Sequence, residues 1–214
     1  MRTTITLVLL LAATAPHAAS FDCAKAKAPM EKLICGDAEV SKLDEAVAQA
    51  YREAQAAQGT TKLLVTRWQR DWLRMVRDDC SDAPCLRQAY GAHLAELREH
   101  AQAAASAPAI GRFGRIVKGK PDRHEAQLLL VPLKAGRARV VGYASWVGDA
   151  ARGNVNVGEA TAVVAIQGER ARFDNGNGCA FDLALADGDL VASGDAGSCG
   201  GLNVTFDGRY RKVQ

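Results

Sequence analysis

Gln69-Arg70-Asp71-Trp72-Leu73 lies near the end of the stretch that decides the fold of this chain, which runs from Cys23 to Cys85. Cys23 and Cys35 open the stretch, and Cys80 and Cys85 close it. Apolar residues between them recur every three or four positions, which predicts helices that each bury one face. We therefore expect a small helical domain that disulfides hold together at one end.

Three helices are predicted, after a short helical turn that has Pro29 near its start. Ser41, with Asp44 three residues later, resembles a capping box and predicts where the first helix begins. Trp68 and Trp72 are expected in the core of the domain, although one exposed ring would make an aromatic binding surface. The predicted apolar faces are Leu43, Val47, Tyr51 and Ala54 in the first helix, Leu64, Val65, Trp68, Trp72, Met75 and Val76 in the second, and Leu86, Tyr90, Leu94 and Leu97 in the third.

Short connections make consecutive helices antiparallel, so the four cysteines should meet at one end of the bundle. The pairing Cys35–Cys80 with Cys23–Cys85 is favoured, because each bridge would tie the N-terminal segment to the bundle. A Cys35–Cys80 bridge closes about 45 residues, and the chain-entropy model assigns it about 4 kcal/mol. The local pairing, Cys23–Cys35 with Cys80–Cys85, remains open. An internal ion pair of Asp44 with Arg70 or Arg77 is also possible.

Residues 1–20 have the features of a secretory signal peptide: a positive start, an apolar run over Ile5–Ala15, and small residues at Ala18-Ala19-Ser20. The mature chain then begins near Phe21, in the periplasm or outside the cell. The apolar run is shorter than the roughly 20 residues of a membrane span, so no membrane insertion is expected. Export favours disulfides for all six cysteines, and their spacing does not match a zinc site.

The second half of the chain predicts an all-β domain over residues 111–214, after an Ala/Pro-rich linker over residues 101–110. Strand-like runs alternate with turn signals such as Asp187-Gly188, and Cys179 and Cys199 flank that turn and are expected to pair. At least seven short strands favour an antiparallel sandwich or barrel. The predicted fold is thus α+β with two domains, a disulfide-stapled three-helix domain over residues 21–100 and the β domain.

The charge is nearly balanced, with a net charge of +3, but it is unevenly distributed. Arg112–Arg139 is rich in Lys and Arg, whereas Phe173–Gly208 contains six aspartates and no basic residue. A basic segment can bind nucleic acid, but export and the acidic segment argue against that partner. Two solvated faces of one domain are the simpler interpretation.

No signature of an enzyme is found, neither a nucleophile elbow nor a zinc-protease, P-loop or dinucleotide-binding motif. His93, His100 and His124 stand apart from any nucleophile pattern. Asp174, and Asp187 with Asp189, fit turns better than a calcium loop, which needs a closing Glu. We therefore expect no catalytic residue, no cofactor and no metal.

An ordered set of residues over Cys23–Leu97 resembles the LprI-type lysozyme inhibitor family. The matching residues are Cys23, Glu31-Lys32-x-Ile34-Cys35, Leu43-Asp44, Tyr51, Gln69-Arg70-x-Trp72-Leu73, Arg77-Asp78-x-Cys80, Cys85-Leu86, Tyr90 and Leu97. The family often places its Arg-Asp pair nearer to Trp-Leu than Arg77-Asp78 lies here. The segment from Cys199 to Arg211 also resembles a tail associated with this family. The resemblance implies an exported helical module that, in some members, inhibits lysozyme.

Two functions are therefore expected as alternatives. The first is stoichiometric inhibition of a lysozyme, which requires a protruding loop that fills a carboxylate-lined cleft on a basic enzyme. The second is a non-inhibitory module of the cell envelope that binds a protein partner or a cell-wall glycan. The candidate partner-binding residues are Asp182, Asp187, Asp189 and Arg70.

Overall fold

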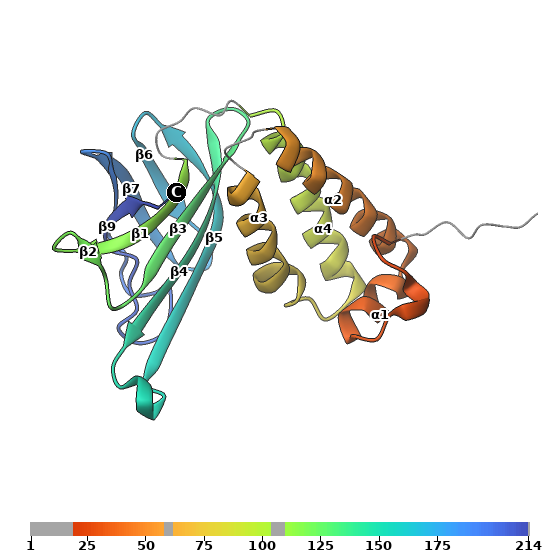
Figure 1. Ribbon diagram of the computed structural model, residues 1–214, viewed down its shortest axis with the longest axis horizontal. Helices are drawn as coiled ribbons and strands as arrows, with labels where there is room; N and C mark the ends of the chain where they lie inside the picture. Colours follow the sequence, from red (N-terminus) through yellow and green to blue (C-terminus); the bar gives the residue numbers. More distant parts are fainter. Residues whose placement is uncertain (1–18, 58–61, 104–109, 214) are drawn as a thin grey trace, which may run out of the picture.

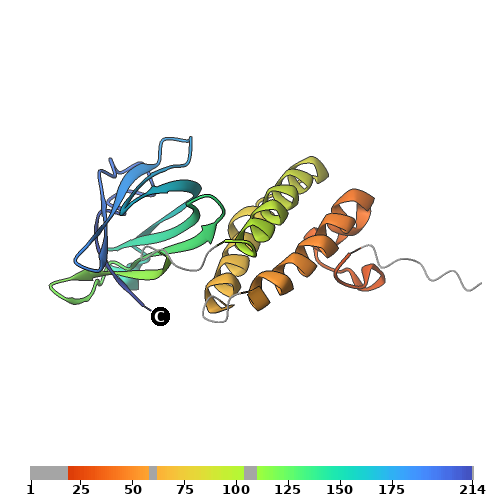
Figure 2. The same ribbon diagram turned by 90° about the horizontal axis from the view of Figure 1, so that it is seen from above.

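A computed structural model describes residues 19–57, 62–103 and 110–213, and shows a helical region beside a β-barrel (Figures 1 and 2). The predicted signal peptide, residues 1–20, and the predicted linker, residues 101–110, lie mostly outside these ranges. The predicted α+β fold with a helical domain followed by an antiparallel β domain is confirmed, and the β domain is a barrel. The helices are α1 (Pro29–Gly36), α2 (Ala38–Ala57), α3 (Lys62–Trp72) and α4 (Ala83–His100), with short helical turns η1 (Cys23–Lys25) and η3 (Leu73–Arg77).

Helix α2 begins earlier than predicted, because Asp37 caps it. The Asp37 carboxylate accepts hydrogen bonds from the backbone N–H groups of Glu39 and Val40, which leaves Ser41 inside the helix. Ser41 instead donates its hydroxyl to the carbonyl oxygen of Ile34, at 2.8 Å. The predicted capping box at Ser41 and Asp44 is therefore wrong, and Asp44 has another role.

The helical core contains both tryptophans of α3, as predicted. Trp68 is 2 % exposed and Trp72 is 7 % exposed, so neither ring forms an exposed aromatic surface. They pack among the apolar faces of α2 and α4, where Trp72 meets Tyr90 edge to face at 5.1 Å. The predicted helical faces are thus the faces that the fold buries.

The four N-terminal cysteines pair locally, as Cys23–Cys35 and Cys80–Cys85, with Cα–Cα distances of 5.7 and 5.5 Å. The favoured pairing, Cys35–Cys80 with Cys23–Cys85, is wrong. The Cys23–Cys35 bridge joins η1 to the last turn of α1, and the Cys80–Cys85 bridge closes the turn that leads into α4. Both bridges are therefore local and do not tie the N-terminal segment to the bundle. Cys179–Cys199 pairs as predicted.

The β domain is a closed antiparallel barrel of eight strands, in which the first strand also pairs with the last. Its hairpin turns follow the sequence signals: Asp187 and Gly188 both have positive φ, at 55° and 81°, as a two-residue hairpin turn requires. The strands are β1 (Gly111–Val117), β3 (Ala126–Leu133), β4 (Arg137–Val147), β5 (Val155–Gln167), β6 (Arg170–Asp174), β7 (Ala180–Ala186), β8 (Asp189–Ser193) and β9 (Gly208–Lys212), and the two-residue β2 (Lys120–Pro121) pairs with the end of β1.

Side chains fill the interior of the barrel. Phe173, Phe181 and Phe206 form a stack, with ring centroids 4.5 Å apart for the first pair and 5.2 Å apart for the second. Tyr210, also fully buried, donates its hydroxyl to the carbonyl oxygen of Phe206 at 2.6 Å. The barrel interior is thus a packed core, and a binding site would lie on the outer surface of the barrel.

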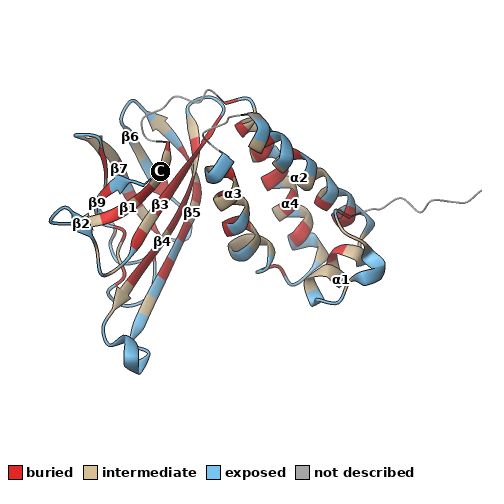
Figure 3. Cartoon of the chain, viewed as in Figure 1, coloured by how far each residue is buried: buried red, intermediate tan, exposed pale blue. Residues whose placement is uncertain are grey.

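The helical region covers the outer face of β3, β4 and β5 (Figures 1 and 3). Leu128 and Leu130 of β3 belong to the barrel core, whereas Leu129 and Val131 belong to the helical core, so this strand is buried on both faces. His100, at the end of α4, shares a hydrogen bond with the Pro132 carbonyl oxygen at 2.9 Å. The two regions therefore share a buried interface.

Candidate functional site

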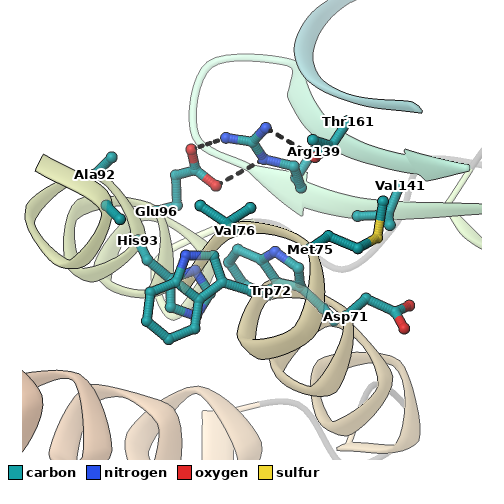
Figure 4. A pocket seen from close by; sticks show the side chains of 12 residues that line it. Asp71, Trp72, Met75, Val76, Ala92, His93, Glu96, Arg139, Val141 and Thr161 are labelled. Atoms are coloured by element: carbon teal, nitrogen blue, oxygen red, sulfur yellow. Dashed lines mark hydrogen bonds and ion pairs between the residues drawn. The ribbon is translucent and has the colours of Figure 1, made fainter. Parts of the chain in front are cut away.

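A cavity of about 220 Å³ lies at this interface, between α3, α4 and the outer face of the barrel (Figure 4). Its walls are mainly apolar and aromatic, and its polar groups come from both regions. The cavity exists only because the helices pack against the barrel. Its lining residues are Trp68, Asp71, Trp72, Met75, Val76, Ala89, Ala92, His93, Glu96, Arg139, Val141 and Thr161.

His93 is the most unusual group in this cavity. Its ring stacks on Trp72, with centroids 4.1 Å apart and planes 7° apart, and meets Trp68 edge to face at 4.9 Å. Nε2 lies 2.8 Å from the side-chain oxygen of Gln69, an acceptor, so Nε2 carries the proton. Nδ1 is then a buried acceptor, and no described residue donates a hydrogen bond to it.

Burial lowers the pKa of His93 to about 3, and the nearby positive charge of Arg139 acts in the same direction. The ring is therefore neutral at physiological pH and is a poor proton donor there. Burial also lowers the pKa of His100, although its hydrogen bond to Pro132 opposes the shift.

The rim of the cavity is an ion pair between the two regions. Arg139 of β4 donates from Nε to Glu96 of α4 at 2.8 Å, and its Nη2 also contacts that carboxylate. Nη1 of Arg139 lies 3.3 Å from the Thr161 hydroxyl. Arg137 and Glu99 form a second pair between β4 and α4, at 2.5 Å.

The cavity has mainly apolar walls, so it suits a small apolar molecule. Its charged groups are already paired, because Asp71 binds Arg67 at 3.1 Å and Glu96 binds Arg139. Within the described ranges no cluster of His, Cys, Asp or Glu is arranged to hold a metal ion.

We expect the stability of the protein to fall as the pH drops below about 6.5, the ordinary pKa of histidine. In acid the unfolded chain binds protons on histidines whose proton affinity is lowered by burial in the folded protein. His93 alone should therefore lower the free energy of unfolding by about 1.4 kcal/mol for each pH unit of acidification between pH 6.5 and its folded pKa. His93→Phe keeps a stacking ring but no titrating group, so its free energy of unfolding should fall less steeply with acid.

Urea unfolding at pH 7, 6, 5 and 4 measures these slopes. Trp72→Phe is the control, because it disturbs the same ring stack without removing a titrating group, and its slope should match that of the wild type. Equal slopes for His93→Phe and wild type would contradict a buried neutral His93.

Each predicted partner-binding aspartate has an arginine neighbour within the barrel, and the side chains of Asp182 and Asp187 remain exposed. Asp182 pairs with Arg172 at 3.1 Å, and Asp187 lies 3.8 Å from Arg209. Asp189 is 8 % exposed, and hydrogen bonds from Arg211 and Arg209 hold its pKa below its usual range. Their part in binding a partner stays a prediction.

Arg70 contacts none of these aspartates among the residues described. It lies on α3 and lines a separate recess of about 140 Å³ with Leu63 and Arg112. Its predicted ion pair with Asp44 is also absent from the described contacts, and Arg77 pairs with Asp78 instead, at 2.6 Å. The four candidate residues therefore do not form one site.

A projecting hairpin formed by the ends of β4 and β5 was not predicted from the sequence. The pairing of β3 with β4 stops at Ala144, whereas the pairing of β4 with β5 continues to Val147 and Val155. The hairpin therefore extends past the neighbouring strand (Figure 1). The only sequence signal for it is the combination of Gly148, Gly153 and small or polar residues between two strand-like runs.

The tip of the hairpin is ordered by its own backbone. The turn η4 (Ala150–Arg152) is closed by Gly153, which has a φ of 71°, and Asn154 donates its N–H to the Asp149 carbonyl at 2.9 Å. All residues from 148 to 155 are exposed, and the Arg152 side chain is 85 % exposed. Arg152 forms an exposed ion pair with Asp149, at 3.3 Å.

Both edges of the hairpin are braced. On the β5 edge, Gly201 donates its N–H to Val157 at 3.0 Å and Asn156 donates to the Leu202 carbonyl at 2.7 Å. On the β4 edge, the Val147 N–H donates to His124 at 2.9 Å. The β5 contacts come from the segment that follows Cys199, so the Cys179–Cys199 bridge helps to position the hairpin.

The tip and the candidate aspartates lie at opposite ends of the barrel. Strands β4 and β6 run toward the end that carries the tip, and β5 and β7 run away from it, because neighbouring strands are antiparallel. The turn at Asp187 follows β7, so it lies at the far end. One partner cleft cannot hold both features.

Comparison of the chain with protein-family models, curated proteins and solved structures finds no significant match. The three disulfides are typical of a protein in an oxidising compartment outside the cytoplasm. No helix in the described part of the chain is long and apolar enough to cross a membrane.

Proposed function

We propose that this protein is a periplasmic or secreted inhibitor that binds a lysozyme stoichiometrically and inserts the β4–β5 hairpin into the active-site cleft. The resemblance of Cys23–Leu97 to the LprI-type inhibitors supports the class of partner. The observation that carries the proposal is the braced, projecting hairpin with Arg152 exposed at its tip.

The chemistry of the tip suits such a cleft. Glycoside hydrolases such as lysozyme act through two carboxyl groups that flank the scissile bond, so their cleft attracts a cation. The tip is narrow, because glycines and alanines flank its one arginine. A guanidinium can bind a carboxylate through two parallel hydrogen bonds, which a lysine cannot do.

The hairpin is already ordered before it binds, which favours high affinity for a partner. A loop that is already in its bound shape loses little conformational entropy on binding, so more of the contact energy appears as affinity. The hydrogen bonds within η4 and the two braced edges supply that order before the partner arrives. The long helical region lies on the barrel face next to the hairpin and leaves its tip uncovered (Figure 1).

Arg152→Ala should weaken inhibition by about 30-fold or more, because a buried charge pair across an interface typically contributes at least about 2 kcal/mol. The assay is lysis of a peptidoglycan suspension by several types of lysozyme, titrated with the full-length protein. Arg172→Ala is the matched control, because Arg172 is another exposed, ion-paired arginine on the barrel, with 55 % of its side chain exposed. Its inhibition constant should match that of the wild type.

Absence of both binding and inhibition across all lysozyme types would overturn the proposal. Equal inhibition by Arg152→Ala and wild type would support inhibition of lysozyme but would show that Arg152 at the hairpin tip is not the inhibitory site. The alternative, a non-inhibitory envelope module, is favoured only by the cavity beside Trp72. Soluble cell-wall fragments that shift the tryptophan fluorescence, without any lysozyme binding, would support that alternative.

A further inference from the structure

Asp44 is a buried carboxylate in the helical core, with 7 % of its surface exposed. One oxygen, Oδ1, accepts a hydrogen bond from the Tyr90 hydroxyl at 2.8 Å. The other, Oδ2, accepts two bonds from Ser20, from its backbone N–H at 2.8 Å and from its hydroxyl at 2.5 Å. All three donors are neutral groups.

A buried carboxylate ordinarily has a cation beside it, because removing an unpaired charge from water is costly. Within the described ranges no Lys or Arg forms an ion pair with Asp44. Arg77 lies within hydrogen-bonding reach of the Tyr90 hydroxyl and lowers its pKa, but its ion pair is with Asp78. Among the described side chains no cation therefore contacts Asp44 directly, and Arg77 is linked to it only through the Tyr90 hydroxyl.

Ser20 stands where the sequence predicts removal of a signal peptide. Hydrolysis of the Ala19–Ser20 bond adds water across the amide, leaves a carboxylate on Ala19, and leaves the Ser20 nitrogen as an α-ammonium group. This nitrogen lies 2.8 Å from Asp44 Oδ2 before any cut. The reaction thus creates a positive charge at the place where the buried carboxylate lacks one.

We propose that a signal peptidase cuts between Ala19 and Ser20, and that the new α-ammonium group of Ser20 is the counter-ion of Asp44. This bond is one residue before the boundary that the sequence favours. Cleavage then strengthens the folded helical domain, because a neutral hydrogen bond becomes a buried ion pair. Removal of the leader thus affects the stability of the fold through this one site, and the inference does not depend on the proposed binding to lysozyme.

The first test is the N-terminus of the protein after export from a bacterial host, measured by intact mass and N-terminal sequencing. The expected mature chain begins with Ser20. A chain that begins with Ala19, that begins with Phe21 or later, or that retains residues 1–19, overturns the proposal.

The second test measures how much the α-ammonium charge of Ser20 contributes to thermal stability. A chain that begins with one extra glycine before Ser20 moves the ammonium away while Asp44 stays intact. Its melting temperature at pH 6 should be about 5–10 °C lower than that of the chain beginning with Ser20. Asp44→Asn should remove the difference between the two chains, whereas Asp79→Asn, an exposed carboxylate with no ion pair described, should preserve it.

The pH dependence separates an ion pair from a steric effect of the added glycine. An α-amino group ordinarily loses its proton near pH 7.7–8.0, and an ion pair in the folded state retains that proton to higher pH. The advantage of the Ser20 chain should therefore be complete below about pH 7 and fade above that range as the amine deprotonates.

The neighbouring groups keep their charge over this range. Burial, followed by the charge of Asp44, raises the pKa of Tyr90 well above its usual value, so its hydroxyl stays neutral. An advantage that is equal at pH 6 and pH 10, or no advantage at all, would overturn the ion pair.

Discussion

Phe181→Ala should lower the free energy of unfolding by about 3–5 kcal/mol, the usual cost of deleting a fully buried phenyl ring. Phe181 is the middle ring of the stack that fills the barrel, between Phe173 and Phe206. All three rings are 0 % exposed. Removing the middle ring leaves both neighbours without a packing partner, and the closed barrel limits how far its strands can collapse.

Urea unfolding followed by circular dichroism measures this loss. Phe21→Ala is the matched control, because Phe21 is only partly buried at the edge of the helical core and its loss should be much smaller. A loss below about 1 kcal/mol for Phe181→Ala would mean that the barrel interior is not the packed core described above.

Asp122→Asn should cost about 3–5 kcal/mol, because it leaves a buried guanidinium without its anion. The Arg115 side chain is 6 % exposed and its Nε lies 2.8 Å from Asp122 Oδ2. The same guanidinium donates to the carbonyl oxygens of Thr205 and His124, each at 2.6 Å. It therefore joins β1 and the turn after it to the segment around Thr205, 90 residues further along the chain.

The matched control for this prediction is Asp182→Asn, which removes the same charge from an exposed pair. Exposed ion pairs contribute about 0–1 kcal/mol, so the stability of that variant should stay close to that of the wild type. Thermal and urea unfolding of both variants give the comparison. Similar losses of unfolding free energy for the two variants would contradict a larger contribution from the buried Arg115–Asp122 pair.

Much of the fold follows from local patterns in the sequence. Helical periodicity identifies the faces that contain Trp68, Trp72 and Tyr90, and these faces are buried. The run Leu128–Val131 is apolar at every position, and the structure gives the reason: one face lines the barrel and the other meets the helices. Turn residues such as Asp187-Gly188 mark the hairpins because only certain residues adopt their backbone angles.

The N-terminal disulfides show where such reasoning fails. Loop-closure entropy favours bridges between distant cysteines, since they restrict the unfolded chain more. The native pairing depends instead on which Cβ atoms face each other, and Cys23 and Cys80 face their local neighbours. The spacing of the four cysteines along the chain does not determine their pairing, because it does not specify which Cβ atoms face each other at the end of the helical bundle.

The site was less predictable than the fold. The cavity, the ion pair of Arg139 with Glu96 and the neutral His93 all arise where helices meet the barrel. Arg139 and Glu96 are 43 residues apart in the sequence, and the cavity lining extends from Trp68 to Thr161. The basic segment Arg112–Arg139 supplies arginines to buried and interfacial pairs rather than to a free surface. The projection of the β4–β5 hairpin could not be predicted from the sequence either, because it depends on where the neighbouring strand stops.

The sequence by itself determined the two-region order, the helical faces, the antiparallel β domain and the Cys179–Cys199 bridge, because periodicity, turn chemistry and loop closure are local properties. The tertiary structure alone decided the local cysteine pairing, the arginine partners of the acidic residues and the burial of Asp44 beside Ser20. These features depend on the distance between residues far apart in the chain, which is set only when the helices and the barrel pack together.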